Sequence, residues 1–130
     1  MPRSASEHPT ELELRILKIL WRQSPLRVRE MREALANEGH EIAHTSVITM
    51  LNIMVEKGYL KRQPVKNAFC FEPRVSEKDI SAGMLGDVID RVFDGSAMAV
   101  ALSLFDRSDL NPEELKELRR LVNQKVKEQT

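Results

Sequence analysis

The chain has 130 residues, of which 42% are hydrophobic and 31% charged, a composition typical of a folded protein and too apolar for a disordered one. No apolar run approaches the roughly 18 residues of a membrane span, and the N-terminus lacks the apolar stretch of a signal peptide. The single cysteine, Cys70, cannot form an internal disulfide. We therefore expect a cytoplasmic protein without membrane insertion, long enough for one domain or a small domain with an appendage.

The net charge is zero, but the two halves of the sequence differ in charge. Residues 1–74 contain twelve Lys or Arg against nine Asp or Glu, a net charge of +3. Residues 75–130 contain eight against eleven, a net charge of −3. Such a difference indicates that the first half meets a polyanion such as nucleic acid, although three charges are a small excess.

In chain order, the first predicted element is a helix that begins after Thr10 and ends near Trp21. Thr10 and Glu13 have the spacing of a capping box, in which a hydroxyl and a carboxylate satisfy two free backbone amides. Apolar residues follow at helical spacing until Ser24 and Pro25 break the pattern. Residues 1–9 are predicted to be a disordered tail.

Two further helices are predicted, from about Val28 to Asn37 and from His44 to Lys57, where Gly58 ends the second. At 100° per residue, one face of the helix over 44–57 is apolar and holds Val47, Met50, Leu51, Met54 and Val55. The opposite face is mostly short and polar and holds Thr45, Thr49, Asn52 and Glu56, flanked by Ser46, Ile48 and Ile53. This polar face is either an ordinary solvated surface or a surface for base edges, and its short hydroxyl and amide side chains favour the second.

Two extended runs follow, residues 59–63 and 68–72, joined by a four-residue connection over 64–67. Aromatic and small apolar residues around a tight polar connection predict a two-stranded hairpin. Three helices followed by a hairpin within about 65 residues is the plan of a winged helix-turn-helix. We therefore expect residues 10–74 to form a winged-helix DNA-binding domain.

The second half, residues 75–130, is predicted to be helical, with a cap at Ser76 and helices over about 77–93, over 96–105 and from Asn111 onward. The last helix is expected to bury Leu115, Leu118, Leu121 and Val122. Residues 76–126 hold about eighteen large apolar side chains, which three helices of this length bury poorly alone. We therefore predict a helical dimerisation domain with an interface that contains Leu85, Val88, Ile89, Val92, Phe93, Val100, Leu102, Leu104 and Leu118. The predicted fold class is mostly α with a small β-hairpin.

The sequence resembles the penicillinase-repressor family of winged-helix transcriptional regulators, the BlaI/MecI type. The resemblance is carried by ELRILKILW over residues 13–21 before Ser24-Pro25, TSVITML over 45–51, VEKGYL over 55–60, FCFEP over 69–73 and VSE over 75–77. It covers roughly residues 10–125, nearly the whole chain. It departs from the family at Ile53, where a basic residue is frequent, and at Lys66-Asn67, where the wing tip usually carries Gly-Arg.

The resemblance implies a homodimeric repressor on a palindromic operator, with recognition helix 44–57 in the major groove and wing 59–72 on the DNA backbone. It implies base contacts from Thr45, Ser46 and Thr49, and we add Asn52 as an adenine partner if the helix tilts inward. In antibiotic-responsive members it also implies release by proteolysis, so a regulatory protease linked to a membrane sensor is a candidate partner.

Five basic residues are candidates for contacts with DNA phosphates: Arg27, Arg29, Lys61, Arg62 and Lys66. Arg27 and Arg29 begin the helix that crosses the DNA backbone in this motif, but ordinary surface arginines are an equal alternative there. Lys61, Arg62 and Lys66 lie in the predicted hairpin. A basic hairpin beside DNA would place these charges near phosphates, which favours the phosphate contact.

The remaining motifs predict no enzyme, no cofactor and no metal site. There is no phosphate-binding glycine loop, no nucleophile motif and no carboxylate pair on an apolar background. His40 and His44 are four residues apart, but the first lies in a predicted loop and no second cysteine follows at ligand spacing. The alternative function is a winged-helix adaptor that binds protein without binding DNA.

Overall fold

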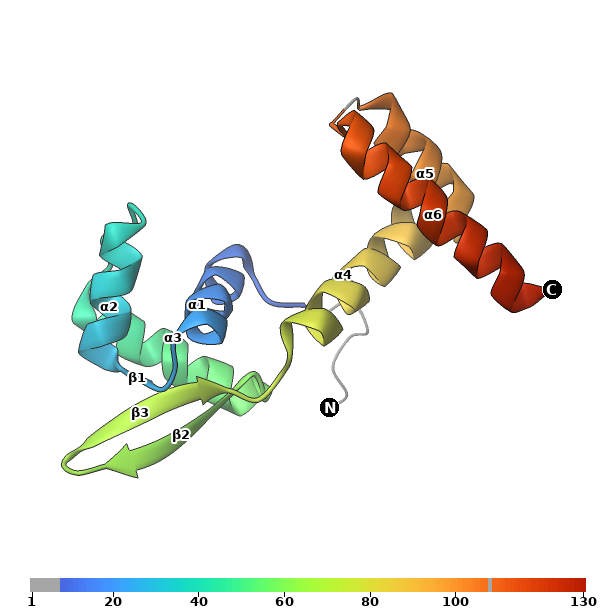
Figure 1. Cartoon of the computed structure of the whole chain (residues 1–130). Helices are drawn as coiled ribbons and strands as arrows, with labels where there is room; N and C mark the ends of the chain where they lie inside the picture. Colours follow the sequence, from blue (N-terminus) through green and yellow to red (C-terminus); the bar gives the residue numbers. More distant parts are fainter. Residues whose placement is uncertain (1–7, 108) are drawn as a thin grey trace. The chain divides into compact units, whose positions relative to one another are not determined.

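The computed structural model of the chain describes residues 8–107 and 109–130 (Figure 1). Its elements are α1 (Glu11–Arg22), β1 (Leu26–Arg27), α2 (Val28–Asn37), α3 (His44–Lys57), β2 (Leu60–Val65), β3 (Ala68–Pro73), α4 (Glu77–Val92), α5 (Ala97–Asp106) and α6 (Pro112–Gln129). The chain forms two compact units, the first ending at Leu85 and the second beginning at Gly86. Of the predicted N-terminal tail, residues 1–7 lie outside the described part, while Pro9 is buried.

The predicted helix ends are confirmed where they rest on capping groups. The Thr10 hydroxyl accepts from the Glu13 amide at 3.2 Å, and the Glu13 carboxylate accepts from the Thr10 amide at 2.9 Å. Gly58 ends α3 with φ of 89°, in the left-handed region that favours glycine. The Ser76 hydroxyl accepts from the Asp79 amide at 3.0 Å and so caps α4.

The predicted hairpin is confirmed by β2 and β3, but the sheet differs from the prediction in two details. β1 pairs with β3, so the sheet is antiparallel and three-stranded in the order β1-β3-β2. The connection is a two-residue turn, Lys66 and Asn67, and not four residues, because β2 continues through Pro64 and Val65. A two-residue strand is too short to show alternation, and a proline is tolerated in β2 because β2 is an edge strand.

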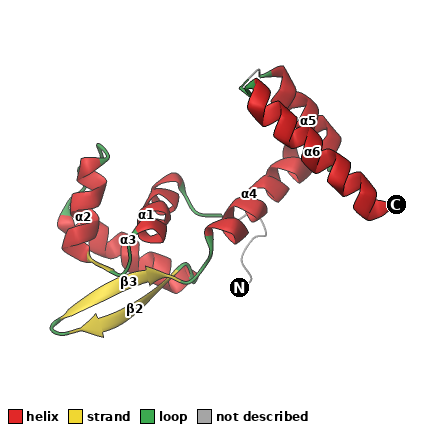
Figure 2. Ribbon diagram, viewed as in Figure 1, coloured by secondary structure: helices red, strands yellow, loops and turns green. Residues whose placement is uncertain are grey.

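A hydrophobic core fills the first unit, and its members come from α1, α2, α3 and the sheet. Figure 2 shows these helices in red and the strands in yellow. Its buried members are Ile16, Leu17, Ile19, Leu20, Met31, Leu35, Val47, Leu51, Met54, Tyr59, Leu60 and Phe71. Val75 and Ile80 pack against this core, and the Trp21 indole N–H donates to the Val75 carbonyl at 2.9 Å. The core therefore includes residues beyond Arg74, in agreement with a first unit that ends at Leu85.

The core also contains one ion pair. The Glu13 side chain is almost fully buried, and one of its oxygens lies 2.8 Å from the Lys57 ammonium. Glu13 belongs to the first turn of α1 and Lys57 to the last turn of α3. The pair therefore joins the start of one helix to the end of another.

The helices α4, α5 and α6 contain no buried residue. The expectation that the last helix buries its apolar residues is wrong for the isolated chain, because Leu115, Leu121 and Val122 are 42%, 45% and 58% exposed. Eleven large apolar side chains between Leu85 and Val126 are exposed, against two in the rest of the described chain. Helices without a second layer have nothing against which to bury such faces.

Candidate nucleic-acid interface

The exposed face of α3 is the centre of the candidate interface. Val47, Leu51 and Met54 are fully buried and fix the helix on the core, so the opposite face is presented to solvent. Thr45, Ser46 and Thr49 are all exposed on that face, within the first turn and a half of the helix. Ile53 is 38% exposed further along α3. In helix-turn-helix proteins, the N-terminal part of the motif's second helix enters the major groove. In this chain α3 corresponds to that helix.

The hydrogen bond made by the Thr49 hydroxyl limits what this side chain can offer a base. The Thr49 hydroxyl donates to the Thr45 carbonyl at 3.0 Å, which uses its only hydrogen. It therefore presents acceptor lone pairs and a methyl group to a partner. An acceptor matches the amino group of cytosine or adenine, and a methyl group matches the methyl of thymine.

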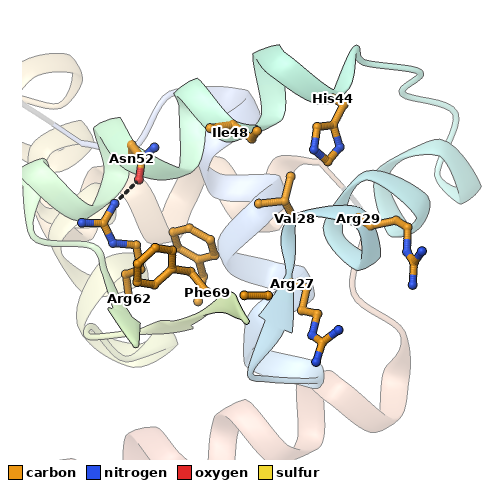
Figure 3. A pocket seen from close by; sticks show the side chains of 10 residues that line it. Arg27, Val28, Arg29, His44, Ile48, Asn52, Arg62 and Phe69 are labelled. Carbon is orange, nitrogen blue, oxygen red and sulfur yellow. Dashed lines mark hydrogen bonds between the residues drawn. The ribbon is translucent and has the colours of Figure 1, made fainter. Parts of the chain in front are cut away.

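Asn52 lies about one turn further along α3 and is hydrogen-bonded to a residue of the wing, the hairpin of β2 and β3. The Arg62 guanidinium donates to the Asn52 side-chain oxygen at 2.8 Å (Figure 3). The same guanidinium stands over the Phe69 ring, 4.8 Å from its centre. One predicted base contact and one predicted phosphate contact are thus joined by a hydrogen bond.

The other two wing cations lie in different environments. Lys61 is opposite Glu72 in the ladder and 3.5 Å from its carboxylate, and strand alternation places it on the other face of the hairpin from Arg62. Lys66 lies in the turn with φ of 57°, is exposed, and forms no ion pair within residues 8–107 and 109–130. Lys66 is therefore the wing cation that is free to meet a phosphate.

Arg27 and Arg29 line a pocket of about 510 Å³ between the start of α2, α3 and the hairpin (Figure 3). The Arg27 amide donates to the Glu30 carboxylate at 2.8 Å, which orders the first turn of α2. The pocket walls are Val28, His44, Ile48, Asn52, Arg62, Ala68, Phe69 and Phe71, and none of its lining residues is acidic. Three arginines and no acidic residue line this partly apolar pocket, a balance of charge that favours an anionic partner.

Nothing in the described part of the chain gathers three or more metal-ligating side chains, and none of its helices has the length and apolarity to cross a membrane. Cys70 is buried in β3, between the two phenylalanines.

A comparison with protein families matches the model described as penicillinase repressor to residues 9–124. The chain belongs to the penicillinase repressor family. This is a family of transcriptional repressors and not of enzymes.

Relatives of similar length support the assignment. The penicillinase repressor of Bacillus licheniformis is 23% identical over 115 residues, which cover 88% of this chain and 89% of the relative. The methicillin resistance regulatory protein MecI of Mammaliicoccus sciuri is 22% identical over 113 residues, which cover 87% of this chain and 91% of the relative.

Among solved structures, the DNA-binding domain of the repressor BlaI is 24% identical, with a TM-score of 0.48 over 57% of this chain and 92% of that domain. The reduced form of MarR from E. coli is 16% identical, with a TM-score of 0.45 over 88% of this chain and 76% of that chain.

Sequence reasoning did not identify two side-chain contacts, one at the candidate interface and one at the core. It assigned Asn52 to a base and Arg62 to a phosphate without relating the two residues, although both lie beside the helix-to-hairpin junction. It identified Glu13 as a capping residue but not its pair with Lys57. A buried carboxylate in an amphipathic helix is a sign that a cation lies nearby, because an unpaired buried charge is costly.

Proposed function

We propose that the chain is a sequence-specific repressor that binds a palindromic operator as a homodimer. The carrying observation is the exposed hydroxyl face of α3, formed by Thr45, Ser46 and Thr49 on a helix fixed to the core by its opposite face. Short uncharged side chains on a rigid helix suit base edges in a major groove. Binding to an operator also places the site of action in the cytoplasm.

The phosphate contacts follow from the positions of the cations. Lys66 lies at the wing tip, Arg27 and Arg29 lie at the start of α2, and Lys61 lies on the opposite face of the wing from Arg62. Cations at these positions would hold the protein on the duplex and set its register without carrying sequence information. Arg62 is considered separately below.

The homodimer is supported by the apolar faces of α4, α5 and α6. The side chains of Leu85, Val88, Val92, Leu102 and Leu104 are 42–66% exposed, and Ile89, Phe93, Val100 and Leu118 are partly exposed. Apolar surface of this extent marks an interaction site on a soluble protein. A second copy would cover it and double the number of half-sites that one particle contacts.

The decisive experiment is selection of DNA by the full-length protein from a pool of randomised duplexes, followed by titration of the enriched duplex at several salt concentrations. Enrichment of an inverted repeat and a steep fall of affinity with salt are expected. An adaptor that binds protein through the same surfaces would enrich no sequence, and its binding would depend weakly on salt. Release by a protease linked to a membrane sensor stays a prediction.

A further inference from the structure

The hydrogen bond between Arg62 and Asn52 joins the wing to the recognition helix. Arg62 is an exposed residue of β2, and Asn52 is a half-buried residue of α3. Their bond is 2.8 Å long, and the Arg62 guanidinium also covers the Phe69 ring of β3 at 4.8 Å. One side chain therefore contacts the helix and the facing strand of the hairpin at the same time (Figure 3).

The hairpin needs such a contact because the core holds only its base. Leu60 and Phe71 are buried, whereas the side chains of Arg62, Gln63 and Pro64 and of the turn residues Lys66 and Asn67 are exposed. At a rise of about 3.3 Å per residue, Lys66 lies about 13 Å beyond Arg62 along the strand. A small tilt of the hairpin at Arg62 is therefore amplified into a shift of the wing tip.

The bond also determines what Asn52 can do. Bidentate recognition of adenine requires the Asn oxygen to accept from the base while its amide donates. Here one of the two lone pairs of that oxygen already accepts from Arg62, a charged donor that forms a stronger bond than a neutral one, so the bond sets the direction of the Asn52 amide. Asn52 is thereby engaged as an anchor for the wing.

We propose that Arg62 is a positioning residue that acts through Asn52: it fixes the angle of the wing against α3, so that Lys66 meets a phosphate while the α3 hydroxyls face the bases. This inference rests on the proposed function, and it replaces the direct phosphate contact that the sequence predicts for Arg62. The two roles differ in a measurable way, because Asn52 carries no charge.

The test is a double-mutant cycle on the duplex enriched by the wild-type protein. Asn52→Ala and Arg62→Ala should each weaken binding by about three- to tenfold, and the double variant should be no weaker than either single variant. Both single variants should also reduce the salt slope of binding alike, since each releases the same wing tip from its phosphate. Circular dichroism of each variant checks that the winged-helix unit is folded.

A direct phosphate contact gives the opposite pattern and overturns the proposal. Arg62→Ala would then reduce the slope by about one, Asn52→Ala would leave it unchanged, and their effects on affinity would add. Lys66→Ala is the matched control for a phosphate contact. On its own it should reduce the slope, and in the Asn52→Ala background it should have little further effect if the wing tip has already moved away.

A measurement on the free protein separates this proposal from the proposed function. The guanidinium signals of Arg62 in nuclear magnetic resonance spectra should show hindered rotation, and Asn52→Ala should abolish it. Free rotation in the wild-type protein overturns the positioning role even if DNA binds. Hindered rotation in a protein that enriches no duplex leaves the contact standing and refutes the function.

Discussion

Thr49 offers the sharpest test of base recognition at the scale of one residue. Its hydroxyl donates to the Thr45 carbonyl, so the exposed side chain presents acceptor lone pairs and a methyl group to solvent. Thr49→Ala should cost about 1–3 kcal/mol of binding free energy on the operator, the usual size of one lost base contact. Binding to a scrambled duplex should barely change, because Thr49 carries no charge. The measurement is a pair of titrations at one salt concentration.

The stability of the folded protein supplies the control. Thr49 is exposed on α3, so its replacement should change the free energy of unfolding by less than about 0.5 kcal/mol. An equal loss of affinity on operator and scrambled duplex would show that Thr49 contacts the DNA backbone or supports the fold. The assignment of α3 as the helix that contacts the bases would then have to change.

Lys57 tests the buried ion pair. Its ammonium lies 2.8 Å from Glu13, whose side chain is 2% exposed, while its own side chain is 29% exposed. Lys57→Ala leaves a buried carboxylate without its cation and should lower the free energy of unfolding by about 2–3 kcal/mol, less than for a fully buried pair because water reaches the site. Urea unfolding of the wild-type protein and the variant, at the same protein concentration, measures this difference in the free energy of unfolding.

Lys61 is the matched comparison for Lys57. It also faces a carboxylate, but at 3.5 Å and with 55% of its side chain exposed. Lys61→Ala should therefore lower the free energy of unfolding by less than about 1 kcal/mol. Similar losses for the two lysines would mean that the pair in the core contributes no more than a surface pair.

At the scale of an element, the wing is tested by its turn. Lys66 is exposed at the tip and forms no ion pair in the described part of the chain. Lys66→Ala should weaken binding to every duplex about equally and reduce the slope of log K against log salt by about one. Lys125→Ala, at an exposed position of α6, is the control and should leave the slope unchanged. An unchanged slope for both variants would exclude the wing tip from the DNA backbone.

At the scale of the whole molecule, dimerisation is tested on two faces of α6. Val122 shares a face with Leu115, Leu118 and Val126 at helical spacing and is 58% exposed, so its replacement removes little packing within the chain. Val122→Asp should make the protein sediment as a monomer at micromolar concentration. Operator affinity should fall by about 10²-fold, since the second half-site is no longer linked to the first.

Gln124 lies on the opposite face of α6 and provides the matched control. Gln124→Asp introduces the same charge into the same helix and should leave both the dimer and operator affinity intact. A wild-type protein that sediments as a monomer would refute the dimer directly. Equal disruption by both variants would show that charge on α6, and not its apolar face, controls assembly.

Much of the winged-helix unit could be predicted because its signals are local. A capping box spans four residues, and the apolar face of α3 repeats with the helical period, so Thr10, Val47 and Leu51 lie where the sequence predicts. β1 could not be predicted, because Leu26 and Arg27 become a strand only when Phe71 and Cys70 pair with them. The proline in β2 is acceptable only because β2 is an edge strand of the sheet.

Local sequence patterns predict the helices, their ends and the side of each that is apolar, since these depend on neighbours within one or two turns. Tertiary packing determines which polar groups meet. Glu13 and Lys57 are 44 positions apart, and Asn52 and Arg62 are ten apart across a helix end and a strand. It also decided that the apolar faces of α4, α5 and α6 stay exposed within one chain. Periodicity shows that a face is apolar, but only packing determines whether anything covers it.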